Sequence, residues 1–363
     1  MSYDPCALLA ELVRIPSPSG SEARVRDHLW SFFQERGLDV ERVGDSLLVT
    51  IERGLGPTLL LNSHMDTVPA GPSWTADPYA GIWQDGKLVG LGANDAGAAV
   101  VGMIGGALAF AKESGATGTL QLAITACEET TNRGMEDILS HTGLPDGAIT
   151  GEPTGLNVVR AQAGLAVLLA DWEGSSCHAA HAARVEHTNA LLLATSDLAG
   201  FPQCVTLEEE HPLLGASTIT CTQLNAGDRH NRVPDAAQAV FDCRLAPPHT
   251  ASECVALLEE RLPQAEITIR SERLRPVETG DEHPFVQACM KAAGAEAATG
   301  SATMSDMALL AGVPAVKCGP GETARSHVPD EFCLRSEVEA GCAFYTKVIG
   351  ASLESLQLEG ATS

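Results

Sequence analysis

Apolar positions in the first 150 residues alternate between a helical period and short continuous runs. Residues 5–15 and 22–36 repeat apolar side chains at helical spacing, and Ser19-Gly20-Ser21 suits a helix start. Residues 58–62 form a short continuous apolar run, which predicts a strand buried on both faces of a sheet, and residues 120–126 predict a second buried strand. Further predicted elements are strands over 40–52 with a turn at Gly44-Asp45, a strand over 148–150 and a helix over 97–112. This alternation predicts an α/β fold, a mostly parallel sheet flanked by helices.

The pattern changes after about residue 160, where strands and helices follow an α+β order. The predicted strands are 162–173, 215–226, 236–245 and 265–271, and the predicted helices are 187–199 and 250–262. A helix over 283–294, an apolar strand at Ala315-Val316 and a helix from about residue 335 return to the first pattern. We therefore expect one domain over 1–160 plus 274–363, with an inserted α+β domain over 161–273.

Composition narrows the classes of partner and compartment. The 363 residues suggest two domains, and 23 basic against 47 acidic residues give a net charge of −24. Such a surface repels phosphate backbones and anionic lipids, so we expect neither nucleic-acid nor membrane partners. The N-terminus lacks a signal-peptide pattern, and the longest apolar run, 97–111, is too short to span a bilayer. Eleven scattered cysteines without a CxxC pair indicate reduced thiols and a cytoplasmic protein.

A histidine and an aspartate follow the buried run 58–62, in Ser63-His64-Met65-Asp66. Ligands of open α/β sheets bind beyond the carboxyl ends of strands, so this position faces a candidate site of chemistry. If the extended backbone persists, His64 and Asp66 point to the same side, and Asp66 can hold the second ring nitrogen of a metal-bound His64. A strand-end histidine beside a turn aspartate is the structural alternative.

Carboxylates occupy two further turns of the same region. The glycine-rich turn 90–97 places Asp95 at a helix start, where aspartate is also a common cap. No Lys-Ser or Lys-Thr follows these glycines, which disfavours phosphate binding. Glu128 and Glu129 follow the run 120–126, and adjacent carboxylates repel one another unless cations compensate. One of them can bind metal while the other deprotonates water, whereas a solvated acidic turn is the alternative.

Glu152 and His327 complete the set of polar residues near predicted strand ends. Glu152 lies in Gly151-Glu152-Pro153-Thr154, which is uninformative in isolation, and His327 follows a glycine-rich loop, where a surface histidine is the alternative. Jointly the five sites supply two imidazoles and several carboxylates without needing a cysteine. That is the ligand set expected for cocatalytic zinc, with cobalt or manganese as possible substitutes.

These segments resemble one family over nearly the whole chain: the cocatalytic zinc hydrolases that include acetylornithine deacetylase, succinyl-diaminopimelate desuccinylase, aminoacylase and carboxypeptidase G. The matching segments are His64-Met65-Asp66-Thr67-Val68, the turn 90–95, Cys127-Glu128-Glu129, Gly151-Glu152-Pro153-Thr154 and Ser326-His327-Val328-Pro329-Asp330-Glu331. The segments 90–97 and 210–215 are similar to one branch of bacterial N-acylornithine deacylases. The commoner family turn reads Asp-Met-Lys-Gly, whereas this chain has the shorter Asp95-Ala96-Gly97.

The resemblance implies a zinc-exopeptidase-like fold with an inserted lid and dimerisation domain, a homodimer, and two Zn²⁺ per subunit. It implies the metal ligands His64 and His327 on different metals, Asp95 between them, and Glu129 and Glu152 on opposite metals. Glu128 matches the general base and Asp66 the residue that supports His64. His178, four residues after Gly174, matches the residue that stabilises the oxyanion in the partner's site, with His181 as a second candidate. Asn231 matches a substrate-binding residue, and Arg325 suits a substrate carboxylate.

The implied activity is hydrolysis of the amide bond of a small N-acyl amino acid by water activated at the two zinc ions. N-acetylornithine, a substrate of arginine biosynthesis, is the first expectation. An N-succinyl-amino acid desuccinylase, an aminoacylase or a dipeptidase or carboxypeptidase of the same family remains open, because pocket shape decides between them. A non-catalytic metal-binding homologue is the alternative of another class, and the intact Glu128 with a complete ligand set argues against it.

Overall fold

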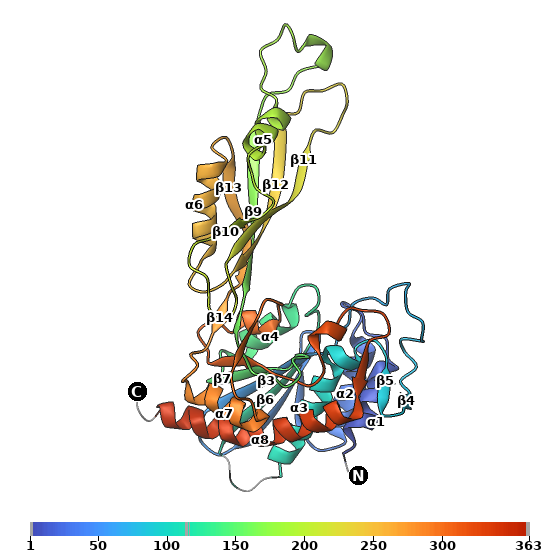
Figure 1. Ribbon diagram of the computed structural model, residues 1–363. Helices are drawn as coiled ribbons and strands as arrows, with labels where there is room; N and C mark the ends of the chain where they lie inside the picture. The colour runs from blue at the N-terminus through green and yellow to red at the C-terminus, as the bar shows by residue number, and fades with distance from the viewer. Residues whose placement is uncertain (1–2, 113–114, 116, 361–363) are drawn as a thin grey trace. The chain divides into compact units, whose positions relative to one another are not determined.

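The chain forms two compact units in a computed structural model, which describes residues 3–112, 115 and 117–360 (Figure 1). The first unit runs to Ala161, resumes over Val277–Gly300 and continues from Ser305. The second unit comprises Gln162–Pro276 and Ser301–Met304. The first unit therefore combines segments that lie far apart in the sequence.

A mixed sheet forms the centre of the first unit. Its parallel part consists of β6 (Gly118–Thr125), β3 (Thr58–His64), β7 (Gly147–Thr150) and β16 (Ala315–Lys317), in that spatial order. The hairpin β1 (Asp39–Val43) and β2 (Ser46–Arg53) extends it antiparallel beyond β6, and β8 (Val159–Gln162), β14 (Val277–Glu278) and β15 (Thr299–Ser301) extend the other side. The α/β class is confirmed, and the four central strands pair in parallel.

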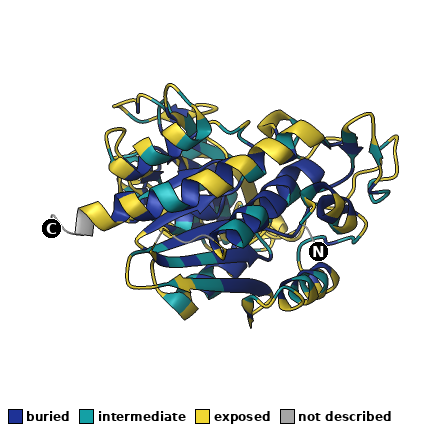
Figure 2. Ribbon diagram, turned by 90° about the horizontal axis from the view of Figure 1, so that it is seen from below, coloured by how far each residue is buried: buried dark blue, intermediate teal, exposed yellow. Residues whose placement is uncertain are grey.

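Helices cover both faces of this sheet, as the continuous apolar runs predicted. Leu59 and Leu61 of β3 belong to the core that contains α1 (Pro5–Val13), α2 (Ala23–Gln34), α3 (Ala98–Phe110), α7 (Pro284–Ala293) and α8 (Arg335–Gly360). Leu60, on the opposite face, packs in a smaller core with Ile138 of α4 (Arg133–Thr142). Figure 2 shows the buried strands in dark blue among helices whose outer sides are exposed.

The apolar segment around α3 is a core helix. Among the described residues, Ala93–Phe110 is the one stretch long and apolar enough to cross a membrane, and 78% of it is buried. The 18-residue helical stretch is longer than the run 97–111 suggested. Glycines let α3 approach α8 closely, because a Cβ at Gly106 would lie 2.8 Å from Cβ of Tyr345. This close contact explains a glycine-rich helix in the interior.

A small three-stranded sheet connects two loops of the first unit. It pairs β17 (Phe332–Leu334) with β5 (Lys87–Val89), and β5 with β4 (Trp83–Gln84), all antiparallel. The segment that precedes β17 contains His327, and the segment that follows β5 contains Asp95. The pairing of β17 with β5 therefore brings the two loops together.

The second unit is an antiparallel five-stranded sheet with helices on one face. Its order is β10 (Val205–Thr206), β11 (Thr218–Ala226), β12 (Ala236–Leu245), β9 (Gly164–Glu173) and β13 (Glu266–Leu274). Alternate residues of β9, from Ala166 to Trp172, pack against α5 (Ala190–Leu198) and α6 (Ala251–Arg261). The period-two burial of β9 and its helical cover give this unit the α+β style expected from its sequence.

Candidate metal centre

The carboxyl ends of the parallel strands gather most of the expected site residues. His64 is the last residue of β3, Glu129 lies four residues after β6, and Glu152 lies two residues after β7. Asp95 comes from the turn before α3, and His327 comes from the loop between β16 and β17. Because parallel strands end at the same edge, these residues from distant segments share one place.

The ligand atoms of His64, Asp95 and Glu129 lie within 4.8 Å of one another. His64 Nε2 is 3.2 Å from Oδ1 of Asp95 and 4.0 Å from Oε1 of Glu152. His327 Nε2 is 2.9 Å from Oε1 of Glu129 and 3.5 Å from Oδ2 of Asp95. The two carboxylate oxygens of Asp95 thus face two different imidazoles, with one further glutamate beside each imidazole.

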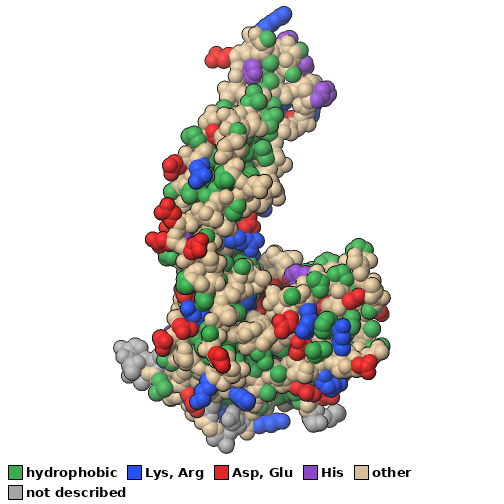
Figure 3. Space-filling view, in the orientation of Figure 1, with side chains coloured by type: hydrophobic (Ala, Val, Ile, Leu, Met, Phe, Trp, Pro, Cys, Tyr) green, Lys and Arg blue, Asp and Glu red, His purple; other side chains and the backbone are tan. Residues whose placement is uncertain are grey.

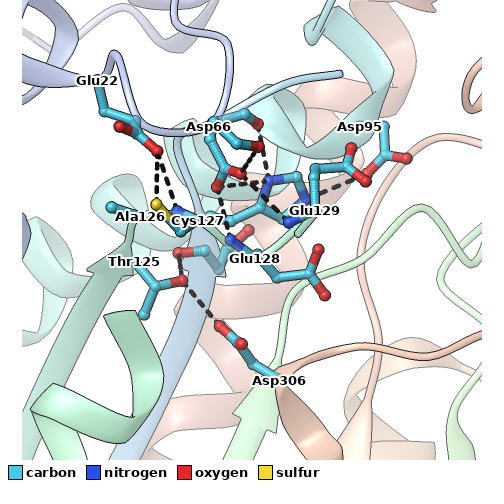
Figure 4. A network of polar contacts seen from close by, with 12 residues as sticks. Glu22, Asp66, Asp95, Thr125, Ala126, Cys127, Glu128, Glu129 and Asp306 are labelled. Atoms are coloured by element: carbon cyan, nitrogen blue, oxygen red, sulfur yellow. Dashed lines mark hydrogen bonds and ion pairs between the residues drawn. The ribbon is translucent and has the colours of Figure 1, made fainter. Parts of the chain in front are cut away.

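Asp66 holds the turn that carries the two adjacent glutamates (Figure 4). Its carboxylate accepts hydrogen bonds from the backbone N–H of Glu128 (3.0 Å) and of Glu129 (3.2 Å), and from the Ser19 hydroxyl (2.6 Å). The nearer partner of His64 Nδ1 is the backbone oxygen of Asp66 at 2.9 Å, whereas the Asp66 carboxylate is 3.7 Å away. The strand ends at His64, so the Asp66 side chain turns toward the glutamates and its carbonyl supports the imidazole.

The carboxylates of the metal centre are buried close together, so their negative charges repel one another. Burial raises the pKa of Glu128 and of Glu129, and it raises the pKa of Glu152 to about 8. Burial alone would raise the pKa of Asp95 as well, but the hydrogen bond and charge of His64 bring it below its usual value. A divalent cation would compensate these charges, and imidazole with carboxylate is the donor set that suits such an ion.

A buried glutamate, Glu331, shapes the turn that delivers Asp95. Its side chain is 1% exposed and accepts hydrogen bonds from the backbone N–H groups of Gly92 (3.2 Å), Asn94 (2.8 Å) and Asp95 (2.9 Å). Gly92 has φ +76°, a conformation that glycine adopts without strain. The peptide bond between Asp95 and Ala96 is cis. The shorter turn of this chain is therefore held by a carboxylate from the segment that carries His327.

Three expected residues make other contacts than those described above. His178 and Asn231 are exposed and belong to the second unit, where the Ala179 N–H donates to the Asn231 carbonyl oxygen (2.9 Å). The rings of His178 and His181 are 5.7 Å apart, and Figure 3 shows histidines gathered at the end of this unit. Arg325 donates to the Glu337 carboxylate at 2.8 Å, so a substrate carboxylate would have to share this guanidinium.

Sequence reasoning missed several polar residues beside the glutamates. Asp306, Asn132 and Lys317 are 1%, 6% and 2% exposed, respectively. Burial lowers the pKa of Lys317, while the charges of Glu152, Glu128 and Asp95 act in the opposite direction. Of these three residues, Lys317 alone carried a local signal in the sequence, because a lysine inside the apolar run 315–318 is unusual. Asparagine and aspartate are common at helix starts, so Asn132 and Asp306 did not stand out.

A model of peptidase family M20/M25/M40 matches residues 60–351. The chain belongs to this family. It is 28% identical to an acetylornithine deacetylase of Proteus mirabilis (strain HI4320), with 92% of each chain covered. It is 30% identical to an acetylornithine deacetylase of Shigella sonnei (strain Ss046), with 88% of this chain and 90% of the relative covered.

Solved structures of family M20 peptidases share the fold. The aminopeptidase PepT of Bacillus cereus matches with a TM-score of 0.76 at 21% identity, over 96% of this chain and 98% of that one. A dinuclear metal-binding M20 peptidase of Bacillus subtilis matches with a TM-score of 0.73 at 17% identity, over 97% and 99% of the two chains. The chain is thus a hydrolytic enzyme that acts on amide bonds, in a metal-dependent family.

Proposed function

We propose that this enzyme hydrolyses the amide bond of an N-acyl amino acid, with N-acetylornithine as the first candidate and arginine biosynthesis as the setting. One observation supports the proposal most strongly. The ligand atoms of His64, Asp95 and Glu129 lie within 4.8 Å of one another, and Glu128 immediately precedes Glu129 in the sequence. The two bacterial relatives, both acetylornithine deacetylases, support the substrate class. An N-succinyl-amino acid desuccinylase, or a dipeptidase or carboxypeptidase of the same family, is the second candidate, because the family that the chain belongs to is a peptidase family.

In this proposal His64, Asp95 and Glu152 hold one zinc ion, and Asp95, Glu129 and His327 hold the other. The distances support this division, because each oxygen of Asp95 faces a different imidazole. Two zinc ions would supply Lewis-acid activation of water and of the scissile carbonyl, and cobalt or manganese suits the same ligands. A complete ligand set beside Glu128 disfavours a metal-binding homologue without catalysis.

Glu128 acts as the general base in the proposed reaction. Its carboxylate takes a proton from the attacking water and later delivers it to the departing amine. Its backbone N–H is fixed by Asp66, which sets the position from which the side chain starts. His178 stabilises the oxyanion, with His181 as the alternative, and Asn231 and Arg325 contact the substrate. We further propose a cytoplasmic homodimer joined through the second unit, which a molar-mass measurement by light scattering tests.

A hydrolysis panel tests the function directly. The zinc-loaded enzyme is given N-acetylornithine, N-succinylornithine, N-acetylcitrulline, N-succinyl-diaminopimelate and a set of dipeptides, and amine release is measured. We expect the highest kcat/KM on N-acetylornithine. A higher kcat/KM on dipeptides would show that the enzyme is a peptidase and would contradict the proposed deacylation. An absence of turnover with two zinc ions bound would favour the non-catalytic alternative.

Glu128→Gln tests the role of the base separately from metal binding. The variant keeps the shape of the side chain and removes its ability to accept a proton as a carboxylate. We expect bound zinc equal to that of the wild type and a loss of nearly all turnover. A zinc-loaded variant with wild-type turnover would remove Glu128 from the mechanism.

A further inference from the structure

A further buried carboxylate, Asp306, lies near the proposed base. It begins a short 3-10 helix (Asp306–Leu309) in the first unit and is 1% exposed. Its Oδ2 accepts hydrogen bonds from Thr125 Oγ1 (2.8 Å; Figure 4) and Asn62 Nδ2 (3.1 Å), and its Oδ1 accepts from Asn132 Nδ2 (3.0 Å). These three donors are neutral. Burying a carboxylate that only neutral donors hydrogen-bond costs folding free energy. We therefore expect Asp306 to contribute to the site.

Asn132 joins Asp306 to Glu128. The same amide nitrogen that donates to Asp306 at 3.0 Å lies 3.4 Å from Oε1 of Glu128. An amide nitrogen carries two hydrogens, so one group can serve both carboxylates. The backbone N–H of Asn132 donates to the Cys127 carbonyl at 2.7 Å, which closes the turn that contains Glu128. The amide is therefore fixed on the segment that carries the base.

Asp306 determines which end of this amide meets Glu128. A side-chain amide has a donor end and an acceptor end, and the two ends have nearly the same shape. An ionised Asp306 only accepts, so it keeps the NH₂ end of Asn132 toward itself and toward the neighbouring glutamate. Without that carboxylate, the amide can turn its oxygen toward Glu128, and the two oxygens then repel each other.

We propose that Asp306 is a positioning residue that acts through Asn132 to hold the Glu128 carboxylate in the orientation required for proton transfer. The inference rests on the proposed role of Glu128 as general base. Asp306 touches neither substrate nor the reacting atoms in this proposal. Asp306 affects the reaction only through the side-chain amide of Asn132, so removing that amide should abolish the effect of Asp306 on kcat.

A double-mutant cycle on Asp306→Asn and Asn132→Gly tests this route in the zinc-loaded enzyme. Glycine suits position 132 because Asn132 has φ +52°. We expect Asp306→Asn to lower kcat by about 10–100-fold, the range typical of groups that orient catalytic ligands, with KM and zinc content nearly unchanged. The double variant should lose no more kcat than Asn132→Gly alone. Multiplicative losses in the double variant, or wild-type kcat in Asn132→Gly, would overturn the proposal, and the second result holds even if Asp306→Asn does not fold.

Thr279→Val is the matched control for lost buried hydrogen bonds. Thr279 is 4% exposed in the same unit, and its hydroxyl donates to the Ala315 carbonyl (2.8 Å) and accepts from the Ala315 N–H (2.9 Å). We expect this variant to lower Tm without lowering kcat. An equal loss of kcat in Thr279→Val would mean that Asp306→Asn acts through general destabilisation, and it would overturn the proposal.

The Tm values of the four proteins in the cycle separate this inference from the proposed function. If the zinc-loaded wild type hydrolyses none of the substrates, the proposed function fails and Tm alone decides the link between Asp306 and Asn132. Shifts that are smaller together than their sum support the pair, because the second substitution then removes a contact already lost. Additive shifts show two independent residues and overturn the link.

Discussion

The contacts of Glu331 predict a measurable loss of stability for Glu331→Gln. Oε1 accepts the N–H groups of Asn94 and Asp95, and Oε2 accepts that of Gly92. The glutamine can keep the first two bonds, but its NH₂ group then faces the Gly92 N–H, donor against donor. A hydrogen bond to a charged acceptor contributes about 1.5–3 kcal/mol, so we expect unfolding to require about 2 kcal/mol less.

The loss should depend on pH in the metal-free protein. Burial raises the pKa of Glu331 to about 7, so the carboxylate is mostly ionised at pH 8 and mostly protonated at pH 6. In the unfolded chain the Glu331 carboxyl has an ordinary pKa of about 4.3 and is ionised at both pH values, so the folded wild type takes up a proton at pH 6 that the unfolded chain does not, and glutamine takes up none. The stability difference between wild type and variant should therefore grow by about 1.4 kcal/mol between pH 8 and pH 6.

Denaturant unfolding at the two pH values measures both quantities. Trp30, Trp74 and Trp83 lie in the first unit, so tryptophan emission follows mainly this unit. Because the turn carries Asp95, zinc affinity of the variant should also fall by about tenfold, measured by competition with a chelator. Equal midpoints at pH 8, or a difference that shrinks at pH 6, would refute the reasoning about this carboxylate.

The remaining predictions concern the metal-free state, the second unit and one glycine. Burial raises the pKa of Glu152 to about 8, so the folded metal-free protein binds a proton between about pH 4.5 and 8 that the unfolded chain does not. Its stability should rise as pH falls through this window, by at most about 1.4 kcal/mol per pH unit, whereas a flat profile after chelation would contradict the shift. His178→Ala should lower kcat by about 10²–10³ with zinc retained, while His181→Ala should not; the reverse result would transfer the role to His181. Gly92→Ala should cost more unfolding free energy than Gly20→Ala, because both have positive φ but only at Gly92 does a Cβ meet a neighbouring side chain, at 2.7 Å. Equal losses would show that this contact relaxes.

The long elements of both units were predictable because their signals are local. The apolar residues of β3 and β6 mark strands buried on two faces, and the observed bounds differ from the predicted ones by at most two residues. The helix α4 and the three short strands β4, β5 and β17 were not predicted. Strands of two or three residues carry too little pattern to be recognised, and their stability comes from partners distant in sequence.

The site was predictable in its residue types and less so in its contacts. The motifs around His64 and Glu129 indicated which groups meet, because parallel strands end at one edge. The carboxylate of Asp66 was expected to support His64, yet β3 ends at His64 and the side chain turns to another partner. Asp306 and Asn132 are 174 positions apart in the chain, and no local pattern reports a hydrogen bond of that span.

Three buried carboxylates share one task around the centre. Asp66 binds the backbone of the turn that contains Glu128, and Glu331 binds the backbone of the turn that contains Asp95. Asp306 binds one side chain of β3 and one of β6. A lysine or arginine partner would neutralise such a carboxylate. In the contacts that shape the turns, however, these three carboxylates accept hydrogen bonds from neutral N–H and O–H groups. When these carboxylates are ionised, their negative charge adds to that of the proposed ligands. A pocket organised in this way favours a divalent cation strongly, because the ion relieves repulsion from the scaffold as well as from its own ligands. Metal binding and folding of the first unit should consequently be coupled, with chelation lowering the stability of this unit more than that of the second.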